Sequence, residues 1–201
     1  MAITSYDDLR HFYGEPSEVA RKKLQSRLDA HCRRFIALSP FMVLASSGGD
    51  GSVDASPKGD PPGFVAVLDD RTLLVPDRPG NNRVDTMGNL LANPHVALLF
   101  FVPGMNETLR VAGRAEITTD EALLTPLAVN GRLPRAGLLV HVEEAFLHCA
   151  RALVRAQLWN AEKHIDRASF PSAGQIYADQ IEGLEPEEAQ RGYEERSRCL
   201  Y

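Results

Sequence analysis

Positively charged side chains flank two short apolar runs in the first half of the chain. Lys58 precedes the run Phe64–Leu68, and Arg78 and Arg83 follow the run Thr72–Val75. If the two runs are neighbouring strands of a hairpin, the flanking loops bring these cations to one end of it. Ammonium and guanidinium groups bind phosphate through charge-assisted hydrogen bonds. The residue types and their spacing therefore indicate an anion site.

The sequence also predicts a helix that begins beside these cations. Asn82 is a residue type that caps helix N-termini, and Asp85, three residues later, can complete a capping box. The free N–H groups and the dipole of a helix N-terminus favour an anion. Together these features predict a phosphate site. On residue types alone, an ordinary hairpin with solvated charges and a capped helix explains the same pattern, so both interpretations stay open.

Other kinds of reactive site have no matching pattern. The six histidines form no close pair at metal-ligand spacing, and His-Glu-x-x-His is absent, so we expect no metal site. Gly-x-Ser-x-Gly and the dinucleotide-binding glycine motif are also missing. Gly48–Gly51 lacks the Lys-Ser/Thr pair that grips phosphate, and we expect it to be a turn.

Short apolar runs separated by turn residues predict an antiparallel β structure. The expected strands are 41–45, 52–56, 64–68, 72–75, 96–102, 108–118 and 138–147. Phe41–Ala45 is continuously apolar, which is typical of a strand buried on both faces. Thr108–Thr118 alternates between apolar and polar residues. With one helix, Arg83–Ala92, inserted, these strands indicate a closed antiparallel barrel, because closure removes exposed strand edges.

Helices are expected on both sides of the strands. Pro16–Leu38 has apolar residues at helical spacing with basic residues between them, and shorter helical patterns cover 120–129, 149–158 and 172–181. The glutamate-rich segment after Gly183 is either a loose helix or disordered, because its composition fits both. The predicted organisation is an N-terminal helical extension (1–40), a main domain (41–160) and a C-terminal helical extension (161–201).

Composition narrows the class of protein. The 44% hydrophobic and 24% charged residues are typical of a soluble globular protein, and the net charge of −5 argues against general binding to nucleic acid. Three cysteines without a Cys-x-x-Cys pair fit a reducing compartment. Charged residues interrupt the start of the chain, and the longest apolar stretch is far shorter than the ~20 residues of a membrane span. We therefore expect a cytoplasmic protein that binds neither membrane nor nucleic acid.

An ordered series of motifs resembles a known family. The series is Ala92-Asn93-Pro94, then Leu98–Phe101, then Arg110-Val-Ala-Gly-Arg114. Over Phe41–Trp159 the chain resembles the split-barrel flavoproteins of the pyridoxamine 5′-phosphate oxidase class. The resemblance implies a mainly β protein with flanking helices, built on a split antiparallel β-barrel. It also implies FMN bound at the subunit interface of a homodimer and an oxidoreductase activity.

The resemblance also implies which residues bind FMN. The family's phosphate-binding Ser-Arg-Lys run matches Asn81–Arg83, and a family Gln matches Thr108. Two family cations are replaced by Gly63 and Leu68, so Lys58 and Arg78 are predicted to stand in for them. The predicted cofactor-binding residues are Ser56, Lys58, Pro76, Asp77, Arg78, Asn81, Asn82, Arg83, Thr108, Arg151 and Trp159.

Trp159 and Arg151, or Arg155 in place of Arg151, have an alternative interpretation. Trp159 is then a buried aromatic residue, and the arginines are cations on a helix surface. The resemblance implies that N5 of the flavin accepts hydride, so we name no catalytic residue. The altered cations and the short Thr108 favour a small-molecule substrate other than pyridoxamine 5′-phosphate. Two other functions stay open: a flavin carrier or sensor, and a haem-binding barrel with His95 or His148 as axial ligand. The sequence does not specify the electron donor, whether NADPH, NADH or F420.

Overall fold

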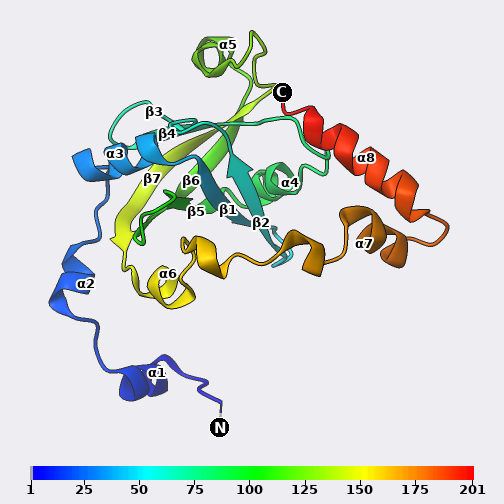
Figure 1. Cartoon of the computed structure of the whole chain (residues 1–201). Coiled ribbons are helices and arrows are strands. Elements are labelled where there is room, and N and C mark those ends of the chain that lie inside the picture. Colours follow the sequence, from blue (N-terminus) through cyan, green and yellow to red (C-terminus); the bar gives the residue numbers. More distant parts are fainter. Residues whose placement is uncertain (1) are drawn as a thin grey trace.

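The computed structural model describes residues 2–201, and its centre is one seven-stranded antiparallel sheet (Figure 1). The strands are β1 (Phe41–Ser47), β2 (Val53–Gly59), β3 (Ala66–Val67), β4 (Thr72–Pro76), β5 (His95–Phe101), β6 (Thr108–Thr118) and β7 (Gly137–His148). Their order is β2-β1-β5-β6-β7-β4-β3. The two end strands, β2 and β3, do not pair with each other, so the sheet is not closed into a barrel by hydrogen bonds among the described residues.

Eight α-helices accompany this sheet within residues 2–201. The α-helices are α1 (Tyr6–Tyr13), α2 (Glu18–Lys22), α3 (Ala30–Leu38), α4 (Asp85–Ala92), α5 (Glu121–Leu124), α6 (Arg151–Ala156), α7 (Ala173–Gln180) and α8 (Pro186–Arg198). Figure 1 shows α1 and α2 extending away from the sheet, while α7 and α8 form a hairpin on the other side of the molecule. Among residues 2–201, no helix combines the length and apolarity needed to cross a membrane.

The hydrophobic core lies on one face of the sheet. Every second residue of the central strands is buried, including Met42 and Leu44 of β1 and Leu98 and Phe100 of β5. Helix α3 adds Phe35 to this core. The expectation that β1 is buried on both faces is therefore wrong, because its intervening residues are only half-buried.

The segment predicted as one helix over 16–38 is broken. Gln25 exchanges two backbone hydrogen bonds with Ala145 of β7, at 3.0 and 2.8 Å, so the chain here extends the sheet. Helix α3 then starts afresh, because the Asp29 side chain accepts a hydrogen bond from the Cys32 N–H at 2.7 Å. The backbone pairing of Gln25 with β7 therefore interrupts the helix that the spacing of apolar residues predicts. The segment after Gly183, left open between helix and disorder, contains the helix α8.

One glycine is required where β6 and β7 pair. The register shifts between Ala112 and Gly113, and a Cβ atom on Gly113 would lie 2.0 Å from the carbonyl oxygen of His141. That oxygen belongs to the backbone of the central sheet, so it cannot move aside as a flexible side chain would. The bulge therefore depends on the missing side chain at this position.

We predict that Gly113→Ala lowers the free energy of unfolding by about 1–3 kcal/mol or more, because the added methyl overpacks the sheet. Chemical denaturation measures the change. The control is Gly88→Ala on α4, where a Cβ meets no atom within 4 Å; this variant is expected to be neutral or more stable by up to about 1 kcal/mol. Equal stability of the Gly113 variant and the wild type would contradict the assignment of the bulge.

Candidate functional site

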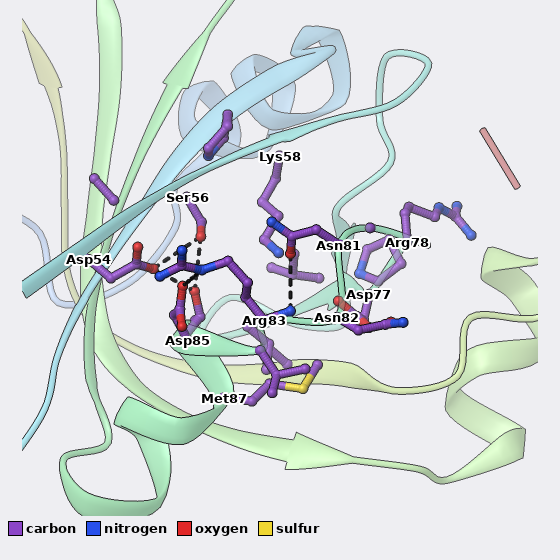
Figure 2. Close-up of a pocket in the computed structure, with 18 residues that line it drawn as sticks. Asp54, Ser56, Lys58, Asp77, Arg78, Asn81, Asn82, Arg83, Asp85 and Met87 are labelled. Atoms are coloured by element: carbon purple, nitrogen blue, oxygen red, sulfur yellow. Dashed lines mark hydrogen bonds and ion pairs between the residues drawn. The ribbon is translucent and has the colours of Figure 1, made fainter. Parts of the chain in front are cut away.

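A cavity of about 400 Å³ lies between β2, the end of β4 and the start of α4. This volume is within the range of small-molecule sites. Eight of the eleven residues predicted to bind a cofactor line it: Ser56, Lys58, Pro76, Asp77, Arg78, Asn81, Asn82 and Arg83. They come from two segments of the chain, β2 and the stretch from the end of β4 to the start of α4. Figure 2 shows Ser56 and Lys58 of the first segment opposite Asn81 and Arg83 of the second.

Strand β2 supplies one wall. Its residues alternate between exposed and half-buried, and Asp54, Ser56 and Lys58 are the half-buried set. Because successive side chains in a strand point to opposite faces, these three point the same way, into the cavity. Pro57 lies between them and has no backbone N–H to donate. It is compatible with the strand because β2 is an edge strand, and its free side forms no hydrogen bonds with another strand.

A polar network fixes β2 against α4. The buried Thr86 hydroxyl lies 3.0 Å from Asp54 Oδ2 and 3.2 Å from Ser56 Oγ, and the Ser56 hydroxyl lies 3.0 Å from the same Asp54 oxygen (Figure 2). One turn later, Asn89 Nδ2 donates to Ser46 Oγ at 2.9 Å. These bonds hold the first turn of the helix beside the strand that carries Lys58. Asp54 and Thr86 are not among the predicted site residues. The alternation expected along a strand places Asp54 on the same face as Ser56 and Lys58, so the sequence contained a signal for Asp54.

The helix starts later than predicted. Helix α4 begins at Asp85, and Val84 at the N-cap position makes no side-chain hydrogen bond to it. The capping box with Asn82 is therefore wrong: Asn82 lies outside the helix with a left-handed φ of 58°, and the Asp85 carboxylate instead accepts from Arg83 Nε at 2.8 Å. Since no side chain of the N-cap residue occupies the first N–H groups of α4, they remain donors for a ligand.

The backbone before α4 is held in an unusual conformation. Val84 has a φ of 52°, which is left-handed and rare for a β-branched residue. Asn81 Oδ1 accepts from the Arg83 N–H at 3.0 Å and stabilises the turn just before it. Strained backbone of this kind concentrates at binding sites, where the surrounding contacts enforce it.

The end of β4 contributes an acid. The Asp77 N–H donates to the Ala136 carbonyl at 3.0 Å, which fixes this residue at the edge of the cavity. Burial raises the pKa of the Asp77 carboxyl, and the positive charges of Lys58 and Arg135 oppose that rise. The positive charges that act on this acid thus come from strand β2 and from the loop before β7.

The cations are not equivalent. Arg78 Nε lies 2.5 Å from Asp60 Oδ2, and these side chains are only 17% and 1% exposed, so most of the Arg78 charge is neutralised within the chain. Arg83 pairs with Asp85 but is 72% exposed. Lys58 forms no ion pair within residues 2–201 and is the cation most available to a ligand. Asp60 is not among the predicted site residues, because no local sequence pattern links it to Arg78, 18 positions later.

The other three predicted residues do not line the cavity within one chain. Thr108 pairs with His148 at the start of β6, and its neighbour Leu109 lies in the same row across the sheet as Lys58, with β5 and β1 between them. Trp159 Nε1 donates to the Met105 carbonyl at 2.6 Å, and Arg151 is exposed at the start of α6.

The alternative haem ligands also lie outside the cavity. His95 Nδ1 is 2.8 Å from Asn93 Oδ1 at the exposed start of β5, and the His148 ring stacks on Phe146 with centroids 4.9 Å apart. Within residues 2–201, no three His, Cys, Asp or Glu side chains gather as a metal site would need.

Several solved structures are similar to this one. HupZ of Group A Streptococcus is 21% identical, with a TM-score of 0.50 over 59% of this chain and 92% of that chain. A variant of HupZ gives 20% identity and the same TM-score over 60% and 99%. A putative pyridoxamine 5′-phosphate oxidase from Lactobacillus delbrueckii is 22% identical over 61% and 95%, with a TM-score of 0.47. The likeness to HupZ extends to the fold.

A comparison with curated proteins finds no match. The family model described as pyridoxamine 5′-phosphate oxidase matches residues 28–149, which is more than half of the chain. The match includes every strand of the sheet and both sides of the cavity. The chain belongs to the pyridoxamine 5′-phosphate oxidase family.

Proposed function

We propose that the cavity binds FMN and that the protein is an FMN-dependent oxidoreductase with a split-barrel fold. The observation that carries the proposal is the meeting of Lys58, the turn 81–83 and the uncapped start of α4 around one cavity. Cations and backbone N–H donors at a helix N-terminus are the groups that bind a phosphate monoester.

The rest of the cavity suits a flavin ring. Val75, Met87 and Leu138 give it an apolar wall, while Ser56 and Asp77 provide polar groups beside that wall. Flavin sites combine such apolar surfaces with a few polar groups that fix the orientation of the ring. These residues suit the two ends of FMN, with the phosphate toward Lys58 and the start of α4 and the ring against the apolar wall.

We further propose a homodimer in which each site draws on two chains. Thr108, Arg151 and Trp159 do not line the cavity of their own chain. A second copy that packs against the cavity would bring its own copies of these residues to it. A twofold dimer contains two equivalent sites of this kind.

When bound, FMN supplies a hydride acceptor and donor. The protein's own groups hold the phosphate, orient the ring against the apolar wall and exclude water from it. Asp77 lines the cavity, and the charges of Lys58 and Arg135 favour its ionised form against the effect of burial on its pKa. No side chain of the cavity is assigned a covalent role.

The absorbance spectrum of the purified protein tests the cofactor first. We expect two visible flavin bands after incubation with FMN and gel filtration, and bleaching by NADPH, NADH or reduced F420. A single intense band near 400 nm would indicate haem instead. Bound flavin that no reductant bleaches, or that turns over no acceptor after reduction, would favour a carrier over an enzyme.

We predict that Lys58→Ala weakens FMN binding by about 1.5–3 kcal/mol, as expected for loss of a charge-assisted hydrogen bond. Riboflavin, which lacks the phosphate, should lose little affinity. Fluorescence titration with both ligands measures the difference, and Lys22→Ala on the exposed surface of α2 is the matched control. Equal losses for the two ligands would show that Lys58 does not bind the phosphate.

We predict that two defective chains complement each other. Lys58→Ala damages the cavity, and Trp159→Phe removes the N–H group of the residue proposed to reach the partner's cavity. After co-expression in equal amounts, half of the dimers are mixed and each mixed dimer has one intact site, so about a quarter of all sites regain wild-type FMN affinity. Either variant alone shows none. If the mixture contains only weak sites although mixed dimers are present, the shared-site proposal is wrong.

We predict that the protein is not an efficient pyridoxamine 5′-phosphate oxidase. A second phosphate beside the flavin needs cations that FMN does not use, but Arg78 is already neutralised by Asp60, and Arg132 and Arg135 do not line this cavity. Aerobic formation of pyridoxal phosphate by the FMN-loaded protein, followed by absorbance, should be undetectable. Turnover of ~1 s⁻¹ or faster, within the usual range of enzymes, would overturn this prediction.

A further inference from the structure

The N-terminal arm, residues 2–27, adds nothing to the hydrophobic core. None of these residues is buried, and the core of the sheet begins with Leu28. Helix α1 lies within this arm and has eight residues. A helix of this length is only marginally stable in water unless another element packs on it. A stable α1 therefore needs a surface that covers it.

Helix α1 has one apolar face. Tyr6, Leu9 and Tyr13 are three and four residues apart, so they lie on the same side of the helix. Asp7 and His11 lie on the opposite side. Tyr6 and Tyr13 are 71% and 69% exposed, so contacts within the chain leave this face in water.

The hairpin of α7 and α8 is also separate from the core of the sheet. Its two helices pack closely at Gly174, where a Cβ atom would lie 2.6 Å from Gln190 Cβ. Within these two helices the buried residues are Gly174 and Ala189. The hairpin therefore has its own packing, and its other faces can meet another surface.

A cavity of about 520 Å³ opens on this hairpin. Its large apolar lining residues are Tyr177, Ile181 and Leu184. Ile181 is 53% exposed, so the apolar lining is open to solvent. Glu188 and Glu195 line the cavity as well and form no ion pair within residues 2–201. The hairpin thus offers an apolar hollow with available carboxylates.

The charges of the arm and of the hairpin are opposite. Residues 16–27 contain four Lys or Arg and one acid, whereas residues 182–198 contain six glutamates and three arginines. Arg10 adds a cation beside the apolar face of α1, with its guanidinium carbon 5.4 Å from the centre of the Tyr6 ring. Its buried Nε has no hydrogen-bond partner within residues 2–201. A carboxylate on the covering surface would satisfy this donor.

The arm and the hairpin of one chain lie apart. Gln25 pairs with Ala145, and Lys23 Nζ donates to the Leu147 carbonyl at 2.9 Å, so the base of the arm is fixed on β7. Figure 1 shows α1 and the α7–α8 hairpin on different sides of the molecule. A second copy of the chain carries the same arm, with the aromatic face and the cation that suit this cavity.

We propose that α1 of one copy docks in the α7–α8 cavity of a second copy, with Arg10 toward Glu188 and Glu195. In a twofold dimer the exchange occurs twice, because each copy carries both an arm and a hairpin. The family model matches residues 28–149, so both surfaces lie outside the part that this chain shares with the family. The inference rests on the proposed homodimer and does not depend on FMN.

Cross-linking between two marked copies tests which surface α1 meets. Serine replaces the exposed Cys149 and Cys199, while the buried Cys32 stays. One copy then carries Glu15→Cys, just after α1, and a second, affinity-tagged copy carries Glu187→Cys, in the first turn of α8. After co-expression, a short bismaleimide should link the two cysteines in the mixed dimers that the tag captures, as mass spectrometry of the peptides will show.

The matched control for this experiment places the second cysteine on α5, as Glu121→Cys, and should give at most a tenth of the product. Mixed dimers that lack the link between positions 15 and 187 would overturn the docking of α1. A tag that captures no untagged copy would overturn it as well, together with the proposed homodimer.

Hydrogen exchange of the full chain tests the apolar contact. The N–H groups of α1 should exchange at least tenfold more slowly than those of an unfolded peptide. Ile181→Ser in the cavity should remove most of this protection, whereas Ile165→Ser, at a 73% exposed position outside the cavity, should change it less than twofold. Unprotected α1 in the wild type, or equal protection in the Ile181 variant, would contradict the proposal. Sedimentation and FMN titration of the wild type report on the proposed function separately.

Discussion

The hydrogen bonds of Thr86 to Asp54 and Ser56 are the contacts on which the rest of the candidate site depends. They join the first turn of α4 to an edge strand that only β1 supports by backbone pairing. Without them, Lys58 on the strand and the N–H donors of the helix would not face one cavity. Because Thr86 is buried, an unpaired hydroxyl here would be costly. The hydrogen bonds of Thr86 therefore fix the position of α4 relative to β2, and with it the shape of the cavity between them.

Charge pairing then decides which groups a ligand can use. The chain neutralises Arg78 with Asp60 and pairs Arg83 with Asp85, so Lys58 is left as the available cation of the first cavity. Asp77 and Arg78 also line a neighbouring cavity, together with Arg132 and Arg135.

Sequence reasoning succeeded where a local pattern determines the structure. The alternation of Thr108–Thr118 predicted the bounds of β6, and Lys58, Arg78 and Arg83, which flank the predicted hairpin, line one cavity. It failed where distant contacts decide: pairing of Gln25 with Ala145 breaks a helical pattern, and Asp85 binds Arg83 where a capping box was expected. The hydrogen bond of the Tyr201 hydroxyl to Asp60 could not be predicted, because nothing local connects residues 141 positions apart.

A crystal structure of the protein with FMN tests the central claim most directly. The account predicts the phosphate within hydrogen-bond distance of Lys58 and of the first N–H groups of α4, and the ring against Val75, Met87 and Leu138. It also predicts Trp159 of a second copy beside the same flavin. Flavin bound elsewhere on the chain, or with its phosphate directed away from Lys58 and α4, would contradict the account.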